Sequence, residues 1–484
     1  MKSLVQIVRA VATGQASAAQ VLEASIARIE ATDSKVNAFT NKTYGRARAE
    51  AAAIDARRAR GEVLPPLAGV PYAVKNLFDM EGVVTLAGSK INRGDKPALQ
   101  DAFLVERMKA AGAVLLGGLN MNEYAYGFTT ENSHYGACHN PHDLTRIAGG
   151  SSGGSGAAIA AGQVPLTLGS DTNGSIRVPS SLCGVWGLKP TFGRLSRRGS
   201  YPFVHSIDHL GPFADSIEGL ALAYDALQSP DPLDPGCHAQ QVQAVAGEMP
   251  RGIEGLRIGV LGGYFKEHAG PDAREVLDRA ARALNATQEV IWPDAALGRA
   301  AAFITTACEG GNLHLEDLRR RMEDFEPLSV DRFLSGVMQP AAWYLRAQRF
   351  RRSYRDAVNA LFGEWDVLLT AATPVSAPVI GAEWIEINGV RHPCRPAMGL
   401  LTQPVSFAGC PVVAAPMWPT GTGGMPIGVQ VIAAPWREDL AMRAARVLQQ
   451  VGAAHTKPCH PGLDPGSMPR MPGSAAVDSG SSPE

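Results

Sequence analysis

The sequence predicts one large α/β domain, and three observations support this prediction. The 484 residues exceed the roughly 100–200 residues of a usual single domain. Hydrophobic residues make up 45% of the chain and charged residues 19%, which allows a substantial core. Short apolar runs that end at Gly, Pro or Asn alternate with helical patterns along most of the chain, without a clear linker. The predicted strands are 113–120, 256–263, 365–374, 411–418 and 427–435.

Helices are expected in the first sixty residues. Ser17 and Gln20 have the spacing of a capping box, and apolar residues at 22, 26 and 29 follow on one helix face. A second helix, rich in alanine and arginine, is expected over 45–60. The segment 456–484 is rich in Pro, Gly and Ser and has almost no apolar periodicity, so we expect a disordered tail after a folded domain over 1–455.

The charge balance offers no global electrostatic attraction for nucleic acid or an anionic membrane, because 45 Lys and Arg oppose 46 Asp and Glu. No run reaches the ~18 consecutive apolar residues of a membrane helix, and no export signal is visible. The seven cysteines are scattered and never form a CxxC pair. We therefore expect a cytoplasmic protein with reduced thiols, no metal site, and no nucleic-acid or membrane partner.

The stretch AGGSSGGSGAAIAAG, residues 148–162, has three competing interpretations. A flexible linker is disfavoured because the stretch lies inside a continuous series of strands and helices. A phosphate-binding loop would need GxxxxGK[ST] or GxGxxG; the stretch contains neither, so no nucleotide cofactor is expected. Residues 150–154 match the GxSxG turn of α/β-hydrolases, which also needs an acid and a histidine downstream; this alternative stays open.

Two serines in glycine-rich turns and one lysine in an apolar segment suggest a nucleophile that works without histidine. Ser151 lies in the first turn, and Ser175 lies in a second turn, SDTNGSIRVPS. Lys75 lies in the segment GVPYAVKNLFD. Burial disfavours the ammonium form of lysine, so a buried lysine can act as a base near neutral pH.

Residues 149–180 resemble the long motif of the amidase signature family nearly position for position: GGSSGGSGAAIAAGQVPLTLGSDTNGSIRVPS. Further landmarks of the family are similar to PYAVKNLFD, GLKPTFGRLSRRG, SIDHLGPFADS, ATPVSAP and QPVSFAGCPVVAAP in this chain. The likeness covers roughly residues 1–455. It implies the amidase signature fold, an α/β domain with a central mixed β-sheet covered by helices on both sides. It also implies hydrolysis of a linear amide C–N bond without cofactor or metal.

The resemblance further implies roles for individual residues. Ser175 is expected to be the nucleophile, Ser151 a bridging serine that follows a cis peptide bond, and Lys75 the general base. The oxyanion hole is expected from the backbone N–H groups of Thr172, Asn173, Gly174 and Ser175. Family members commonly have Gly-Gly where this chain has Asn173-Gly174. Asn tolerates left-handed backbone better than most residues, so the turn is expected to form.

An anionic substrate needs a cationic side chain in the pocket. Tyr344, Gln348 and Arg351 have i, i+4, i+7 spacing, so one helix face would present a hydroxyl, an amide and a guanidinium. Arg177 is a further candidate for substrate binding. A plainer interpretation stays open in both cases. The arginine-rich helix can be a solvated surface, and Arg177 can form a buried pair with Asp171 that braces the nucleophile loop.

Beyond the motifs, the chain is similar to family members that hydrolyse a small, polar, anionic amide together with a small helical accessory subunit in a hetero-oligomer. Three alternatives stay open. The first is the A subunit of glutamyl-tRNA(Gln) amidotransferase, and the second is another small-amide amidase. The third is a catalytically silent scaffold for a partner subunit, against which the intact Lys75, Ser151 and Ser175 argue.

Overall fold

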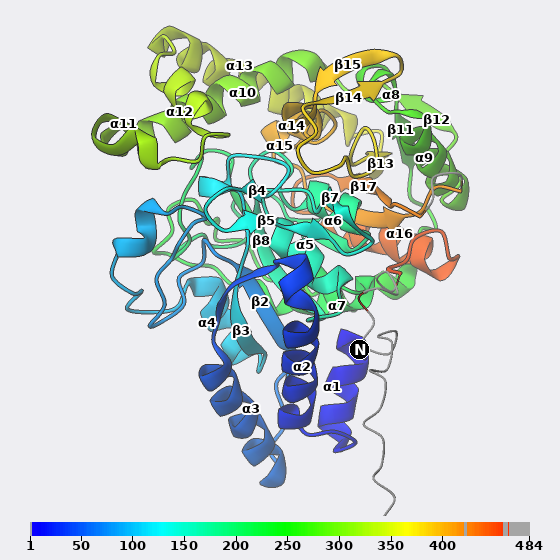
Figure 1. The fold of residues 1–484 in the computed structure, drawn as a ribbon. Coiled ribbons are helices and arrows are strands. Elements are labelled where there is room, and N and C mark those ends of the chain that lie inside the picture. Colours follow the sequence, from blue (N-terminus) through cyan, green and yellow to red (C-terminus); the bar gives the residue numbers. More distant parts are fainter. Residues whose placement is uncertain (1, 421–423, 458–462, 464–484) are drawn as a thin grey trace, which may run out of the picture.

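The computed structural model of the protein describes residues 2–420, 424–457 and 463. Within these residues an 11-stranded sheet runs through the centre of the molecule (Figure 1). In spatial order the strands are β1 (Phe39–Lys42), β3 (Val114–Leu119), β2 (Pro71–Lys75), β8 (Leu166–Asp171), β10 (His209–Ala214), β9 (Trp186–Lys189), β16 (Val412–Met417), β17 (Ile427–Ala433), β13 (Val367–Ala371), β11 (Ile258–Leu261) and β12 (Gln288–Val290).

The sheet is mixed. β2 pairs in parallel with both β3 and β8, and β11 pairs in parallel with β12 and β13. The strands between these two groups pair antiparallel. Because β2 and β8 are parallel neighbours, their carboxyl ends meet at the same edge of the sheet, and the segments that follow them lie close together.

Helices flank the sheet. They are α1 (Leu4–Thr13), α2 (Ala18–Val36), α3 (Tyr44–Ala59), α4 (Phe103–Ala110), α5 (Gly153–Ala160), α6 (Arg177–Cys183), α7 (Ile217–Leu227), α8 (Tyr264–Glu267), α9 (Pro271–Ala283), α10 (Ala295–Leu313), α11 (Leu315–Arg321), α12 (Val330–Val337), α13 (Ala341–Leu361), α14 (Cys394–Ala397), α15 (Gln403–Ala408) and α16 (Glu438–Gln450).

Two groups of helices cover the sheet. α5 and α6 pack against each other and on the central strands, whereas α16 packs on α7, α9 and the strands β16 and β17. Glycines in the strands let α6 approach closely: a Cβ at Gly187 of β9 would overlap the Ser180 hydroxyl of α6. The short, small-residue helices α5 and α6 therefore lie directly on the sheet, where larger strand side chains would hold them off.

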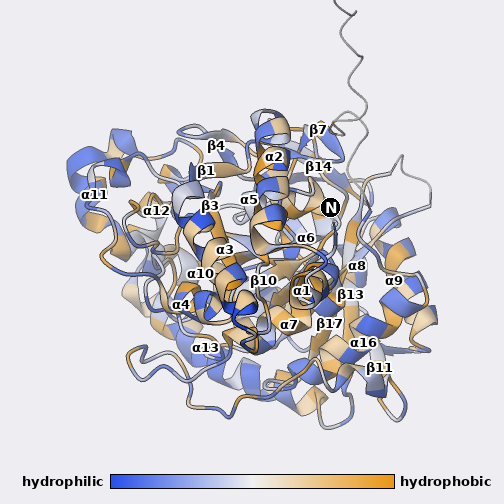
Figure 2. Cartoon of the chain, turned by 90° about the horizontal axis from the view of Figure 1, so that it is seen from below, coloured by the Kyte–Doolittle hydropathy of each residue, from blue (hydrophilic) through white to orange (hydrophobic). Residues whose placement is uncertain are grey.

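The remaining elements lie at two ends of the molecule (Figure 1). α1, α2 and α3 lie at one end, and α10, α11, α12 and α13 lie at the other, near the β14–β15 hairpin (Trp384–Ile387 and Val390–Pro393). The minor pairs are β4–β5 (Glu131–Asn132 and Gly136–Ala137) and β6–β7 (His139–Asn140 and Asp143–Ile147). Figure 2 shows hydrophobic residues on the central strands and hydrophilic residues on outer helices such as α9 and α11.

The predicted fold class is confirmed: the described chain is one domain with a large mixed sheet flanked by helices. All five predicted strands are found as β3, β11, β13, β16 and β17, and the helix expected over 45–60 is α3. Ser17 forms the expected capping box with Gln20 at the start of α2. The predicted tail over 456–484 lies outside the described residues apart from 456, 457 and 463.

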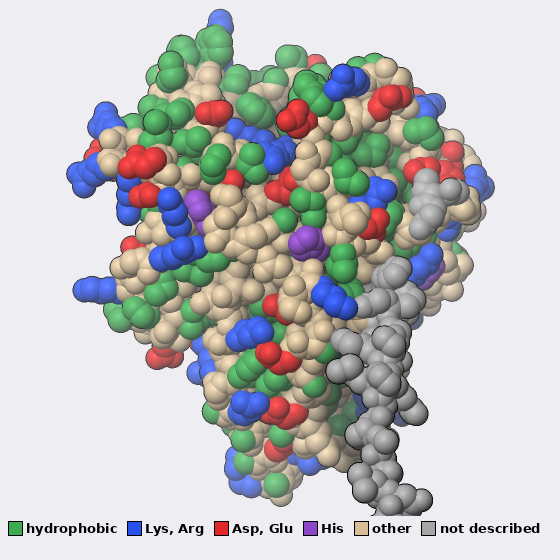
Figure 3. All heavy atoms as spheres, viewed as in Figure 1, with side chains coloured by type: hydrophobic (Ala, Val, Ile, Leu, Met, Phe, Trp, Pro, Cys, Tyr) green, Lys and Arg blue, Asp and Glu red, His purple; other side chains and the backbone are tan. Residues whose placement is uncertain are grey.

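The surface agrees with the balanced net charge. On the face drawn in Figure 3, Lys and Arg side chains are interspersed with Asp and Glu, and no extended basic area is visible. Among the described residues, no helix is both long and apolar enough to cross a membrane.

Gly336 tests the packing between α12 and α10. A Cβ at this position would overlap the carbonyl oxygen of Ala307 on α10. We expect Gly336→Ala to lower the free energy of unfolding by about 1–3 kcal/mol, because one helix must move away from the other. Gly45→Ala is the matched control: it adds a methyl in helix α3 where nothing lies within 4 Å.

Urea denaturation of the two variants and the wild type measures the difference. The control is expected to unfold like the wild type or slightly later, since alanine favours helix by up to ~1 kcal/mol. Equal midpoints for Gly336→Ala and the wild type would contradict the close packing of α10 and α12.

Candidate active site

Lys75 and Ser151 meet at the carboxyl end of β2, and Ser175 lies in the turn that follows the neighbouring strand β8. Lys75 is the last residue of β2, Ser151 lies just before α5, and Ser175 lies in the turn between β8 and α6. The Gly150–Ser151 peptide bond is cis, as the family resemblance implies. All three side chains are buried. The parallel pairing of β2 with β8 thus brings Lys75 beside Ser170, which lies 95 positions later in the sequence.

The Lys75 amine lies between two serine hydroxyls. Its Nζ is 2.7 Å from Ser151 Oγ and 2.8 Å from Ser170 Oγ. Burial lowers the pKa of Lys75 to about 7, although the charges of Asp208 and Asp171 act to raise it. A substantial fraction of the amine is therefore neutral near neutral pH, and a neutral amine can accept a proton from Ser151.

Asp171 holds the turn that carries Ser175. The backbone N–H groups of Ile176 and Arg177 both donate to Asp171 Oδ2. Ser175 lines a narrow cavity of about 30 Å³, together with Phe128, Phe203 and Gln403, among others. Its hydroxyl has no hydrogen-bond partner among the described residues and is free to bind a ligand in that cavity.

The turn from 172 to 175 presents its backbone N–H groups. In the described part of the chain, no acceptor is found for the N–H of Thr172, Asn173, Gly174 or Ser175. Thr402 Oγ1 donates to the carbonyl of Asn173 at 2.7 Å and fixes the turn from behind. Such a row of unpaired N–H groups beside a serine can stabilise an oxyanion.

Where family members commonly have Gly-Gly, this chain has Asn173-Gly174, and the turn needs glycine at the second position. Gly174 has φ +141°, and a Cβ there would overlap Thr402 Oγ1, so this position requires glycine. Asn173 is not among the residues with positive φ in the described chain, so it does not need the left-handed backbone that we expected of it. Its side chain instead donates to Thr306 Oγ1 at 2.8 Å.

Arg177 adopts the bracing position rather than a place in the cavity. It is fully buried and donates two hydrogen bonds of 3.0 Å to Asp171. A further pair of hydrogen bonds goes to the Thr402 carbonyl and to Gln430 Oε1. Burial acts to raise the pKa of Asp171, but Arg177 outweighs it and keeps that pKa well below its usual range. Every side-chain nitrogen of Arg177 is thereby occupied, which favours the plainer of the two interpretations.

The three residues of α13 that were expected to bind substrate also lie outside the Ser175 cavity. Tyr344 and Gln348 both donate to Glu309 Oε1, at 3.0 and 3.3 Å. Arg351 donates to the Phe407 carbonyl at 3.2 Å, and its guanidinium lies over the Phe407 ring. None of the three is among the residues that line the Ser175 cavity. The helical spacing places them on one face of α13, as expected, but that face packs onto α10 and α15.

Two residues at the site were missed by sequence reasoning. Ser170 provides the second hydroxyl beside Lys75. It lies within the motif 149–180, directly before Asp171, and this position could have drawn attention to it. Arg332, on α12, lines the same cavity as Ser175 and lies in a segment, LSVDRFLSGV, that carries no recognisable motif. Ser152 and Ser155 hydrogen-bond to backbone carbonyls of β8 and are structural.

The family model described as Amidase matches residues 20–442, most of the chain. The chain belongs to the amidase signature family. The GxSxG alternative is thereby excluded, in agreement with the structure: Ser152, its serine, bonds to the Ser170 carbonyl and to no histidine among the described residues. The membership makes the chain an amide-hydrolysing enzyme rather than a silent scaffold.

Relatives of known name cover almost the whole chain. It is 73% identical to the AtzE subunit of 1-carboxybiuret hydrolase from Pseudomonas sp. (strain ADP), over 94% of this chain and 99% of that protein. It is 38% identical to the A subunit of glutamyl-tRNA(Gln) amidotransferase from Anaeromyxobacter dehalogenans (strain 2CP-C), over 91% of this chain and 94% of that protein. One solved structure matches with TM-score 0.94 and 72% identity. It is described as an inhibitor-bound, vestigial protein complex that reveals the evolutionary origins of an s-triazine catabolic enzyme. That match covers 94% of this chain and 100% of the other.

Burial of Lys75 has a measurable cost in stability. In the unfolded chain, lysine binds a proton below its ordinary pKa of 10.5, whereas in the folded protein it does so only below about 7. The cost is therefore full at pH 7 and below, and it disappears as the pH rises toward 10.5. We expect Lys75→Met to raise the free energy of unfolding at pH 7 by about 1–3 kcal/mol, less than the full pKa difference because two hydrogen bonds are lost.

Denaturant unfolding at pH 7 and pH 9.5 measures this gain. Lys96→Met, at an exposed lysine, is the matched control and is expected to change the midpoint little at either pH. A gain for Lys75→Met that is as large at pH 9.5 as at pH 7 would contradict the lowered pKa.

Proposed function

We propose that this chain is the catalytic subunit of a 1-carboxybiuret hydrolase in s-triazine (cyanuric acid) catabolism. It cleaves the terminal amide of 1-carboxybiuret to give urea-1,3-dicarboxylate and ammonia. The observation that carries this proposal is the 73% identity to the named hydrolase subunit over nearly the full length of both proteins. The arrangement of Lys75, Ser151 and Ser175 supports an acyl-enzyme mechanism for that reaction.

The first step makes Ser175 a nucleophile. Neutral Lys75 takes the proton of Ser151 while Ser151 Oγ takes the proton of Ser175. Ser175 Oγ then bonds to the terminal carbonyl carbon, and the carbonyl oxygen becomes an oxyanion. The N–H groups of residues 172–175 donate to this oxygen in the transition state.

Collapse of the tetrahedral intermediate breaks the terminal C–N bond. The proton held on Lys75 returns through Ser151 to the leaving nitrogen, which departs as ammonia. Water then attacks the ester carbonyl, gives its proton to the same relay, and releases the second carboxylate while Ser175 regains its proton. The three residues thus end each cycle in their starting protonation states, and no cofactor or metal takes part in any step.

The assembly is proposed from the same relatives. The matching solved structure is described as a protein complex, which supports a small helical accessory subunit in a hetero-oligomer with this chain. We place the enzyme in the cytoplasm, without a nucleic-acid or membrane partner. The 38% identity to the A subunit of glutamyl-tRNA(Gln) amidotransferase supports a second candidate function, that of a glutaminase within a transamidosome. Another small-amide amidase is the remaining alternative.

Ammonia release separates these candidates. We expect purified protein, with its accessory subunit where that is needed, to release ammonia from 1-carboxybiuret generated in situ at least tenfold faster than from glutamine or a neutral aliphatic amide. Ser175→Ala is expected to abolish release, because the variant lacks the hydroxyl that forms the acyl-enzyme. A preference for glutamine would assign the chain to the transamidosome type, and a preference for the neutral amide would retain the amidase mechanism but overturn the substrate.

The pH profile tests the role of Lys75. The pKa of about 7 means that protonation removes the general base below neutral pH. We therefore expect kcat/KM for a stable amide substrate to be level above about pH 8 and to fall roughly tenfold per pH unit below pH 6. A rate that is unchanged between pH 5 and 8 would rule out Lys75 as the base.

Ser170→Ala is expected to lower activity by about tenfold, because one of the two hydroxyls that orient the amine is lost.

A further inference from the structure

Arg332 is a cation in the Ser175 cavity. It lies on α12 and lines the same cavity as Ser175, Thr172 and Asn173, the nucleophile and the first two residues of the N–H row. We propose that the Arg332 guanidinium binds the carboxylate of the substrate and thereby selects anionic amides. This inference rests on the proposed function, which supplies a substrate with a carboxylate at the end opposite to the scissile amide.

The charge of Arg332 has no carboxylate partner. Among the described residues it forms no ion pair; it makes a long hydrogen bond of 3.4 Å to the Tyr126 carbonyl and lies 5.4 Å above the Tyr126 ring. Burial lowers the pKa of Arg332, and the nearby charge of Arg395 adds to this effect. A partly buried guanidinium without a counter-charge is unfavourable, and an anionic ligand would stabilise it.

The other arginines near the cavity either have a carboxylate partner or do not line it. Arg395 forms an ion pair with Glu131 at 3.3 Å. Arg299 donates to Gln403 Oε1 at 3.0 Å and lines a separate cavity with His268 and His392. Arg351 is held by the Phe407 carbonyl away from the cavity. Arg332 is therefore the cation that combines a place in the Ser175 cavity with an uncompensated charge among these described arginines.

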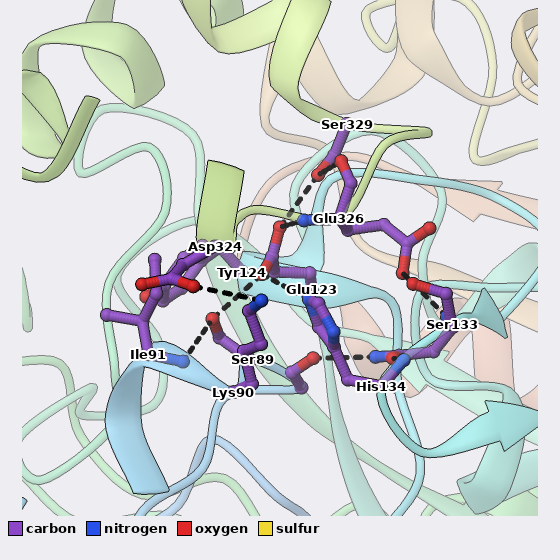
Figure 4. A network of polar contacts seen from close by, with 12 residues as sticks. Ser89, Lys90, Ile91, Glu123, Tyr124, Ser133, His134, Asp324, Glu326 and Ser329 are labelled. Atoms are coloured by element: carbon purple, nitrogen blue, oxygen red, sulfur yellow. Dashed lines mark hydrogen bonds and ion pairs between the residues drawn. The ribbon is translucent and has the colours of Figure 1, made fainter. Parts of the chain in front are cut away.

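A buried carboxylate network fixes the start of α12, and with it the position of Arg332. Glu123 Oε2 accepts from the Glu326 N–H at 2.7 Å and from Ser329 Oγ at 2.9 Å, while Oε1 accepts from Ser89 Oγ (Figure 4). Ser329 is the residue just before α12, and its carbonyl accepts the Arg332 N–H at 3.0 Å.

The same network extends beyond Glu123. Ser133 donates through its N–H and its hydroxyl to Glu326 Oε2, at 2.6 and 2.7 Å, as Figure 4 shows. Glu123 and Ser133 belong to the segment that also carries Tyr126 and Phe128 of the cavity wall. α12 is thus tied to the cavity wall by several buried hydrogen bonds, which hold the guanidinium in one position before substrate enters.

The substrate geometry suits one fixed cation. In 1-carboxybiuret four bonds separate the scissile carbonyl carbon from the carboxylate carbon, a span of roughly 5 Å in an extended chain. A guanidinium on the wall of the narrow cavity that holds Ser175 can bind this carboxylate while the terminal amide lies at Ser175. Binding at the far end would orient the amide for attack and exclude amides that leave the guanidinium unpaired.

Two stable analogues test the proposal without depending on 1-carboxybiuret. Glutaramate has a terminal amide and a carboxylate four bonds away; glutaramide has the same chain with a neutral amide in place of the carboxylate. We compare the concentrations of each that halve the rate at which a fluorophosphonate probe labels Ser175. The wild type is expected to bind glutaramate about 100-fold more tightly than glutaramide, and Arg332→Ala is expected to reduce this ratio to about one.

Matched variants separate the effect of Arg332 from a general loss of cations or of folding. Arg395→Ala removes a compensated charge nearby and is expected to keep the preference for glutaramate. Arg332→Lys retains a positive charge and is expected to keep part of it. Added guanidinium ion is expected to restore glutaramate binding to Arg332→Ala. Unchanged labelling of Ser175 in each variant without competitor confirms that the site is folded.

Each outcome decides one question. Loss of the preference in Arg332→Ala but not in Arg395→Ala supports the proposal. Retention of the preference in Arg332→Ala, or its loss only in Arg351→Ala, overturns it. A wild type without preference for glutaramate also overturns it, even if 1-carboxybiuret is hydrolysed. If the preference depends on Arg332 but 1-carboxybiuret releases no ammonia, the carboxylate site stands and the proposed substrate falls.

Discussion

The buried amine of Lys75 is the constraint on which the site depends. An amine without access to water loses its proton more readily, and this one lies between two serine hydroxyls that hold it in place. The surrounding structure must therefore exclude water around Lys75 and still leave Ser175 open to a ligand. The protein meets both demands by setting Lys75 at the end of a fully buried strand, β2, and Ser175 in a turn that borders the cavity.

The nucleophile turn is braced by a second buried polar network. Asp171 binds the N–H groups after Ser175 and pairs with Arg177, and Arg177 in turn reaches Thr402 and Gln430 on distant segments. Removing one partner of such a pair would leave a buried charge without compensation, which is strongly destabilising. The brace therefore couples the position of Ser175 to the packing of α15 and β17, far away in the sequence.

Much of the fold and the three central residues could be predicted from the sequence, but the cavity wall could not. Strands such as β13 and β16 are continuous apolar runs with clear ends, and the motif around Ser151 and Ser175 is long. β2 and β8 were not predicted as strands, because lysine, serine and aspartate at their ends resemble loop residues. The spacing of Tyr344, Gln348 and Arg351 identified a helix face correctly but not what that face packs against, since periodicity carries no information about partners.

A buried lysine or arginine indicates function only through the groups that lie beside it. Lys189 is as deeply buried as Lys75, its pKa is likewise lowered by burial to about 7, and it donates to the Pro190 carbonyl. Unlike Lys75, it has no hydrogen bond to a serine hydroxyl among the described residues, so a neutral, structurally satisfied amine accounts for it. Arg332 differs from Lys189 because a guanidinium stays protonated near neutral pH and because this one lines the cavity. A partly buried charge that deprotonation does not remove favours an anionic ligand, and the Ser175 cavity is where our proposal places that ligand.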